Sequence, residues 1–167
     1  MNRSGSDARR AILSAFNRLV LTTRRVRPPV TQLLREAGVA RSTLYSHFDD
    51  RDSLLLEAMV GPLSVVADAA VGVGDDQKLV TLLEHFWDQR RGAQDVLEGQ
   101  FSRRLARELG QLIMARDTRL ERDDAVRIAE SLLGYVRLWI SGDTPSSAAI
   151  LARKIIASAA AQREALP

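Results

Sequence analysis

Residues 30–48 read VTQLLREAGVARSTLYSHF, and this stretch decides the fold. Apolar residues recur at helical spacing from Val30 to Ala37, which predicts a short amphipathic helix. Gly38 follows directly, where a residue in the left-handed conformation would end that helix and turn the chain. A second short helix is expected from about Arg41 to His47.

Two residues of the second segment, Leu44 and Phe48, are expected to point back at the first helix. Two short helices joined by a tight glycine turn form a helix-turn-helix, whose second helix lies in the major groove of DNA. The free face of that helix carries Arg41, Ser42, Thr43, Tyr45 and His47. All of these side chains have hydrogen-bond donors and none is negatively charged, so the stretch predicts a DNA-binding unit.

The run AGVARSTLYSHF at residues 37–48, with a basic residue at Arg51, resembles the signature of TetR-family transcriptional regulators. In that family the pattern is A-G-V-S-x-x-T-[LF]-Y-x-H-F-x-x-K, and it lies near the N-terminus. The resemblance covers about the first third of the chain. Ala40 stands where the family places a capping serine, and Leu34 stands where it has a small alanine. Arg51 in place of lysine keeps the charge but changes the donor geometry.

The resemblance implies phosphate contacts that fix the register on DNA, from Thr31, Tyr45, His47 and Arg51. From residue type, the candidates for reading base edges are Arg41, Ser42 and Thr43. Thr31 is also a plausible N-cap for the first short helix, and a cap without a DNA contact is about equally expected. Arg9 and Arg10 could reach a phosphate, although surface arginines more often do nothing specific.

Charge is distributed unevenly along the 167 residues. Residues 1–57 hold ten arginines and six acidic residues, a net +4, whereas residues 58–167 carry a net −1. A basic N-terminal unit on a nearly neutral body is typical of DNA binding at one end. A solvated arginine-rich face would explain the same charge, so the motif carries the prediction.

Enzymatic and metal-binding functions find little support. The chain has no cysteine and two histidines, which excludes disulfides and thiolate metal sites and makes structural zinc improbable. The motifs G-x-S-x-G, G-x-x-x-x-G-K and H-E-x-x-H are absent, so neither catalysis nor a cofactor is expected. No stretch approaches the ~20 apolar residues of a bilayer span, and the N-terminus lacks the apolar core of a secretory signal. A cytoplasmic protein that does not enter a membrane is therefore expected.

The whole chain predicts an all-α fold, with a helix-turn-helix domain over 1–52 and a helical effector-binding and dimerisation domain over 53–167. Helices are predicted from about Asp7 to Arg24, from Arg51 to a break or kink at Gly61-Pro62, from Leu63 to Val71, from Asp75-Asp76 to Gly92, from Gln94 to Arg116, from Glu121 to Ser141, and from Thr144-Pro145 onward. In TetR-like proteins the fourth helix joins the two domains, where a kink at Gly61-Pro62 would serve transmission. A simple interdomain bend would explain the same two residues.

The last two predicted helices carry more apolar surface than two helices of a small monomer can hide. In TetR-like proteins these helices pair with those of a second subunit as a four-helix bundle, so a homodimer is expected. The alternative is that the whole apolar stripe is intramolecular core.

An effector pocket is implied by the resemblance alone. The polar anchor would be His85, Tyr135 or an arginine. The residues able to line the pocket are His85, Phe86, Trp87, Phe101, Met114, Tyr135 and Trp139. Each is individually more typical of core or dimer interface, since apolar residues at helical spacing are mostly packing. A ligand, if there is one, should be small and largely apolar.

The resulting hypothesis is a homodimeric repressor that binds a palindromic double-stranded operator and leaves it when a small apolar ligand binds. Two other classes stay open. One is a DNA-binding dimer without an effector, and the other is a helical protein-interaction module whose helix-turn-helix does not touch DNA.

Overall fold

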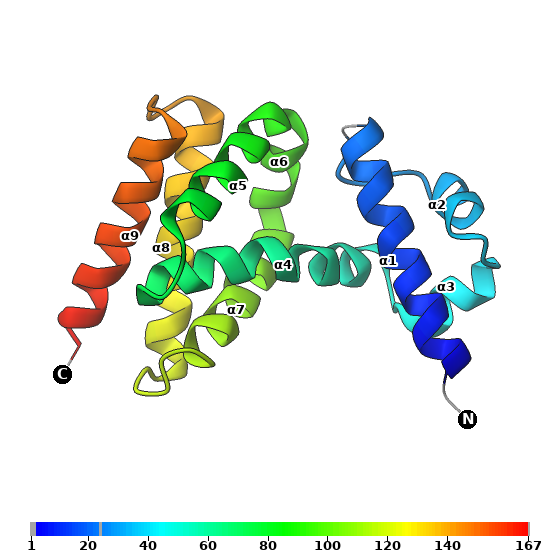
Figure 1. Ribbon diagram of the computed structural model, residues 1–167, viewed down its shortest axis with the longest axis horizontal. Coiled ribbons are helices and arrows are strands. Elements are labelled where there is room, and N and C mark those ends of the chain that lie inside the picture. The colour runs from blue at the N-terminus through cyan, green and yellow to red at the C-terminus, as the bar shows by residue number, and fades with distance from the viewer. Residues whose placement is uncertain (1–2, 24, 167) are drawn as a thin grey trace. The chain divides into compact units, whose positions relative to one another are not determined.

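The computed structural model describes residues 3–23 and 25–166, and within them it contains nine helices and no strand (Figure 1). The helices are α1 (Arg3–Thr23), α2 (Val30–Ala37), α3 (Arg41–His47), α4 (Arg51–Val71), α5 (Asp76–Asp88), α6 (Arg90–Leu97), α7 (Gly99–Met114), α8 (Arg122–Ser141) and α9 (Ala148–Glu164). The predicted all-α fold class is confirmed for these residues. The helix expected to reach Arg24 ends at Thr23, and Arg24 itself lies outside the described residues.

The chain divides into two compact units, Met1–Met59 and Val60–Pro167. The division falls inside α4, whereas the sequence placed a boundary between residues 52 and 53, in the first turn of the same helix. The first part of α4 buries Leu54 and Leu55, and the second part buries Leu63 and Val66 among other residues.

The N-terminal unit packs the long helix α1 against the two short helices α2 and α3 around a small core. The helix α1 packs against both α2 and α3 (Figure 1). Its buried residues Ile12, Phe16 and Leu19 recur every three or four positions, as one face of a helix requires. Leu33 of α2 and Leu44 of α3 complete this core, each with 3% of its surface exposed. The core fixes α3 with its opposite side toward solvent.

The helix α4 runs without interruption from Arg51 to Val71, with Pro62 inside it. The break predicted at Gly61-Pro62 is therefore wrong, and the kink predicted there as the alternative stays a prediction. Proline removes one helical hydrogen bond and costs about 3 kcal/mol in a helix interior. Burial of the apolar side chains that follow Pro62, each worth about 1.5–3 kcal/mol for a large residue, outweighs that cost.

By length and composition alone, α4 is apolar enough to cross a membrane, with a mean hydropathy of 1.7 over its best 18-residue window. The expectation that no stretch has this composition does not hold for α4. In the structure 39% of that window is buried, and buried core helices of other proteins have the same length and apolar composition. This finding by itself does not place the chain in a membrane.

Helix boundaries in the C-terminal unit differ from the prediction at two places before α8. Gly92 does not end a helix but lies inside α6, because α5 already ends at Asp88. The long helix predicted over 94–116 is divided at Gly99, which has φ = 69°. The apolar spacing continues through this turn, so periodicity alone did not reveal it.

The last helix begins at Ala148 and not at Thr144-Pro145. Ser147 is its N-cap, and the Ser147 side chain accepts a hydrogen bond from the Ile150 N–H at 3.3 Å. The Trp139 indole N–H donates to the main-chain oxygen of Ser146 at 2.7 Å. This bond, between residues seven apart in the chain, holds the residues before Ser147 against the end of α8, so the helix starts three residues later than the cap signal at Thr144 predicted.

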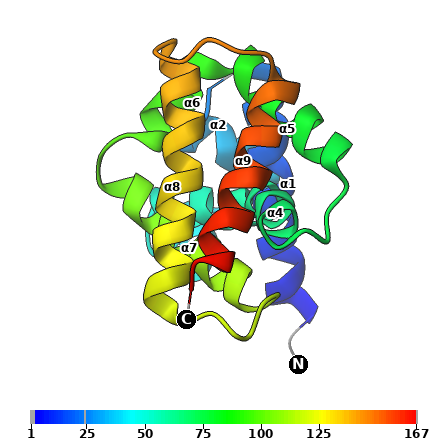
Figure 2. The same ribbon diagram turned by 90° about the vertical axis from the view of Figure 1, so that its left-hand side faces the viewer.

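The core of the C-terminal unit is centred on α8, which packs against α6, α7 and α9. Figure 2 shows α8 and α9 running side by side. The approach of α7 to α8 is close at Gly110, where a Cβ atom would lie 3.0 Å from Cγ2 of Val126. This glycine is therefore required by packing and not by its backbone angles.

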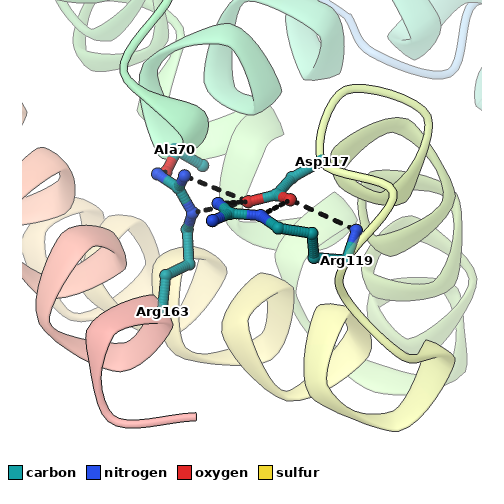
Figure 3. Close-up of polar contacts among 4 residues, drawn as sticks. All are labelled: Ala70, Asp117, Arg119 and Arg163. Carbon is teal, nitrogen blue, oxygen red and sulfur yellow. Dashed lines mark hydrogen bonds and ion pairs between the residues drawn. The ribbon is translucent and has the colours of Figure 1, made fainter. Parts of the chain in front are cut away.

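A buried carboxylate ties three segments of this unit together (Figure 3). Asp117, in the turn after α7, accepts hydrogen bonds from Arg119 Nε at 2.9 Å and from Arg163 Nη2 at 3.0 Å. Arg163, near the end of α9, also donates to the main-chain oxygen of Ala70 in α4 at 3.2 Å. The hydrogen bonds from Arg119, and then those from Arg163, hold the pKa of Asp117 well below its usual range against the opposing effect of burial.

Candidate nucleic-acid interface

The turn between α2 and α3 depends on Gly38, which has φ = 65° and ψ = 31°. This left-handed conformation is costly for residues with a side chain. The next residue, Val39, donates its N–H to the main-chain oxygen of Leu34 at 3.2 Å, which satisfies a carbonyl at the end of α2. The glycine turn predicted from the sequence is thus present, and it redirects the chain into α3 within three residues.

The helix α3 presents one side to the core and the other to solvent. Leu44 and the following Phe48 are each 3% exposed, and both face inward. Arg41, Ser42 and Tyr45 are exposed, while Thr43 and His47 are half-buried. Because Tyr45 is 43% exposed, the predicted polar face of α3 is available to a partner.

Arg41 and Tyr45 lie one helical turn apart on this face. The guanidinium carbon of Arg41 is 5.9 Å from the centroid of the Tyr45 ring, at the outer limit of a cation–π contact. The Tyr45 ring therefore favours one orientation of the Arg41 side chain but does not fix the position of its guanidinium group. Ala40 is the N-cap of α3, and its methyl side chain has no atom able to accept a hydrogen bond, as the sequence implied.

Thr31 is not the N-cap of α2, which corrects the prediction. The helix begins one residue before it, at Val30, and the N-cap is Pro29. The carbonyl of Pro29 accepts hydrogen bonds from the N–H groups of Gln32 and Leu33 at 3.1 and 3.0 Å. The fixed φ of proline suits the position before a helix, so the helix follows Pro29 directly. The capping preference of the Thr31 side chain, on which the prediction rested, does not set the start of the helix. Thr31 is an exposed residue of the first turn.

Arg51 is exposed at the start of α4, and it also holds the loop before α2. Its Nη2 atom donates to the main-chain oxygens of Arg27 at 3.2 Å and Pro28 at 2.9 Å. The resemblance predicted a phosphate contact for Arg51, but it did not predict this contact with the loop. The sequence did contain a signal for it. The two prolines keep the residues before α2 out of a helix, so the main-chain oxygens there need hydrogen-bond donors from elsewhere in the chain.

The two arginines at the start of α1 have different surroundings. Arg10 is exposed and pairs with Asp7 at 3.4 Å on the same helix. Arg9 contacts the end of α3 and α4 through its guanidinium group. Their sequence context did not distinguish them, because both follow Ala8 in a polar stretch.

The residues considered for an effector pocket lie in several environments of the C-terminal unit. Trp87 and Trp139 are in contact, with ring centroids 4.8 Å apart. Phe101 is buried, Phe86 and Met114 are half-buried, and His85 is exposed with its Nε2 atom 3.1 Å from Nε2 of Gln89. The tryptophan pair is thus the part of this set that the structure brings together directly.

Tyr135 lines a shallow surface groove of about 520 Å³ between α8 and α9. The other residues lining it are Lys154, Ala157, Ser158, Ala161, Gln162 and Ala165. Small side chains on α9 form much of this groove, which allows another helix to approach closely. Leu138 and Ile150 of the same two helices are also exposed, by 44% and 39%.

No protein-family model matches this chain, and no curated protein matches it.

Proposed function

We propose that the protein is a DNA-binding transcriptional regulator of the TetR type, acting as a homodimeric repressor on a palindromic operator. The observation that carries the proposal is the exposed polar face of α3, which a left-handed Gly38 and the buried Leu44 and Phe48 orient toward solvent. The resemblance of residues 37–51 to the TetR signature supports the same conclusion.

Base reading is assigned to the N-terminal half of α3. Arg41 and Ser42 are exposed there, and Thr43 is half-buried. In the major groove an arginine makes two hydrogen bonds to guanine, which is worth about 1–3 kcal/mol of discrimination. Arg41 is the residue of this group with the reach and geometry for such a contact.

Phosphate contacts are assigned to the residues around this helix: Thr31, Tyr45, His47 and Arg51. These contacts orient the protein on the duplex and carry no sequence information. The hydroxyl groups of Thr31 and Tyr45 belong to exposed side chains, and Arg51 adds a positive charge. The guanidinium group of Arg51 has five N–H donors, so its bonds to the loop leave it able to donate to a phosphate.

Dimerisation is assigned to α8 and α9. Exposed Tyr135, Leu138 and Ile150 and the alanine-lined groove give these helices an apolar face that a second copy would cover. Reading two half-sites in adjacent turns of DNA requires recognition helices about 34–36 Å apart in the dimer.

The effector is a small apolar molecule that binds the C-terminal unit and favours a dimer unable to span the operator. This part rests on likeness to the TetR type. A DNA-binding dimer without an effector is the second candidate, favoured by the burial of Phe101 and Trp139 in the core of the unit. Release of the operator by apolar compounds, measured by fluorescence anisotropy, separates the two.

The DNA-binding proposal is tested with labelled duplexes at several salt concentrations. The wild-type protein should bind random duplex with an affinity that falls steeply as salt rises, because phosphate contacts release counterions. Selection from a random library should yield a palindromic site. The variant Arg41→Ala should lose affinity for that site and much less for random duplex. Absence of salt-dependent binding to any duplex would instead favour a protein-interaction module.

A further inference from the structure

One guanidinium group, that of Arg9, touches three elements of the N-terminal unit. Its Nε donates to Oε1 of Glu57 in α4 at 2.9 Å, and its Nη2 pairs with Oε2 of the same carboxylate. Its Nη1 donates to the main-chain oxygen of His47 at 2.8 Å. Its carbon atom lies 4.6 Å from the centre of the Phe48 ring. Arg9 itself belongs to α1, so the group links α1, the end of α3 and α4.

The contact with His47 is at the point where α3 ends. His47 is the last residue of α3, and the final carbonyls of a helix have no partner within it. A cation at this end also faces the negative end of the helix dipole. Arg9 therefore caps α3 from another helix, while the buried Phe48 ring below it restricts where the guanidinium can lie.

The guanidinium group of Arg9 is held by contacts within the N-terminal unit. All three nitrogen atoms of the Arg9 guanidinium already donate within the unit, two to Glu57 and one to His47. These bonds use three of the five N–H donors of the group and orient it between α3 and α4. The salt dependence described below decides whether a remaining donor reaches a phosphate. The neighbouring Arg10 is directed at Asp7 in solvent and has no such set of contacts.

We propose that Arg9 is a positioning residue for DNA recognition: with Glu57 it fixes the C-terminal end of α3, and so the angle at which Arg41 and Tyr45 are presented. This inference rests on the proposed DNA-binding function. Arg9 acts through α3 and contacts no nucleotide, and Glu57 acts by holding Arg9.

The test compares Arg9→Met, Arg9→Lys and Glu57→Gln with Arg10→Met, an adjacent arginine on the same helix, as the matched control. The probes are a duplex selected from a random library with the wild-type protein and a random duplex of equal length. Arg9→Met should lower affinity for the selected duplex about tenfold or more, with a much smaller loss on random duplex. Arg9→Lys should restore part of the loss, and Arg10→Met should bind the selected duplex within about twofold of wild type. Binding is measured at a temperature at which circular dichroism shows that all variants are folded. If Arg9→Met does not fold, the test uses Arg9→Lys and Glu57→Gln.

Two readouts distinguish positioning from other roles. The slope of log affinity against log salt should stay at the wild-type value in Arg9→Met, because no phosphate contact is lost; a slope smaller by about 0.9 would show a phosphate contact and overturn the inference. Removing the negative charge of Glu57 should strengthen binding to a polyanion if charge alone matters. Positioning instead requires Glu57→Gln to bind the selected duplex more weakly, so tighter binding would overturn it.

The two proposals fail in different ways. If the wild-type protein binds no duplex, the DNA-binding function is wrong and this inference is wrong with it. If the wild-type protein binds its selected duplex and Arg9→Met binds it equally well, the function stands and the positioning role alone is rejected.

Discussion

Arg51 donates a hydrogen bond to the main-chain oxygen of Pro28 at 2.9 Å, so a residue at the start of α4 holds the loop that leads into α2. The same residue is the one that the TetR resemblance assigns to a DNA phosphate. The loop contact uses the fixed fork of a guanidinium group, whose several donors point in different directions, and the proposed phosphate contact would use it as well. If the proposed phosphate contact is made, arginine can serve both contacts at this position, where the resembled family has lysine.

Substitution of Arg51 by alanine should weaken binding to selected and to random duplex by similar factors. A lost phosphate contact lowers the slope of log affinity against log salt by about 0.9, while Arg51→Lys should keep the slope. Anisotropy titrations at three or more salt concentrations measure both quantities. A lower affinity with an unchanged slope in Arg51→Ala would show that Arg51 acts through the loop alone.

Replacing Gly38 by alanine should lower the free energy of unfolding by about 1–2 kcal/mol, the cost of a side chain in the left-handed region. The cause is conformational, because a Cβ atom at Gly38 would have nothing within 4 Å. Urea denaturation followed by circular dichroism measures the change, at a fixed protein concentration because oligomers gain stability with concentration.

The matched control is Gly134→Ala, since a Cβ atom there would meet only Nη2 of Arg137, at 4.0 Å, and Gly134 lies within α8. Alanine in a helix interior is favoured over glycine by about 0.5–1 kcal/mol, so this variant should be more stable than wild type. The two substitutions should therefore have opposite signs. Equal destabilisation by both would mean that lost packing space, and not φ, governs Gly38.

The sequence predicted α2, Gly38 and α3 within the residues that the structure assigns to them. The signals there are local and agree with one another: apolar spacing, a glycine at the turn and inward-facing Leu44 and Phe48. The prediction was wrong where contacts outside the local capping and helix-breaking signals decide. Pro62 stays helical because apolar residues around it are buried, and the start of α9 depends on a bond from Trp139.

The contacts that organise each unit join residues far apart in the chain, and no periodic pattern encodes them. Arg9 and Glu57 are 48 residues apart, and Asp117 and Arg163 are 46 apart. The sequence offered many arginines of similar local context, so which of them are fixed by carboxylates required the fold. The exposed residues of α3, in contrast, follow from helical geometry alone once Leu44 is placed in the core.

Removing the carboxylate of Asp117 should destabilise the C-terminal unit in a pH-dependent way. Asp117→Asn should lower the free energy of unfolding at neutral pH by about 1–3 kcal/mol, the worth of hydrogen bonds to a charged group. The pKa of Asp117 is lowered in the folded state, so its contribution is complete above the unfolded pKa of about 3.9 and is lost as pH falls toward the folded value.

The difference in stability between wild type and Asp117→Asn should therefore be constant from about pH 7 to pH 5 and should shrink below about pH 4. The two tryptophans of the chain, Trp87 and Trp139, both lie in the C-terminal unit, so their fluorescence follows unfolding of that unit. A difference that stays the same down to about pH 2.5 would contradict the assigned charge on Asp117.

Placing a charge in the groove between α8 and α9 should separate the proposed dimer. Ala161→Arg adds a long cationic side chain at an exposed position that lines this groove. In a two-fold symmetric interface each substitution appears twice, so the two new charges repel each other and crowd the contact. Sedimentation velocity should show a dimer for wild type and a monomer for Ala161→Arg at the same concentration.

The control for this variant is Gln111→Arg, which adds the same charge at an exposed position of α7, away from the groove residues. It should remain dimeric and should bind the selected duplex as wild type does. The monomeric Ala161→Arg variant should bind that duplex much more weakly. A monomer has one recognition helix and binds one half-site, whereas in a dimer the second helix binds the other half-site at a high effective concentration. Unchanged tryptophan fluorescence would show that the C-terminal unit is still folded. If Ala161→Arg stays dimeric, the second copy is held by another surface, and the assignment of α8 and α9 as the interface is wrong.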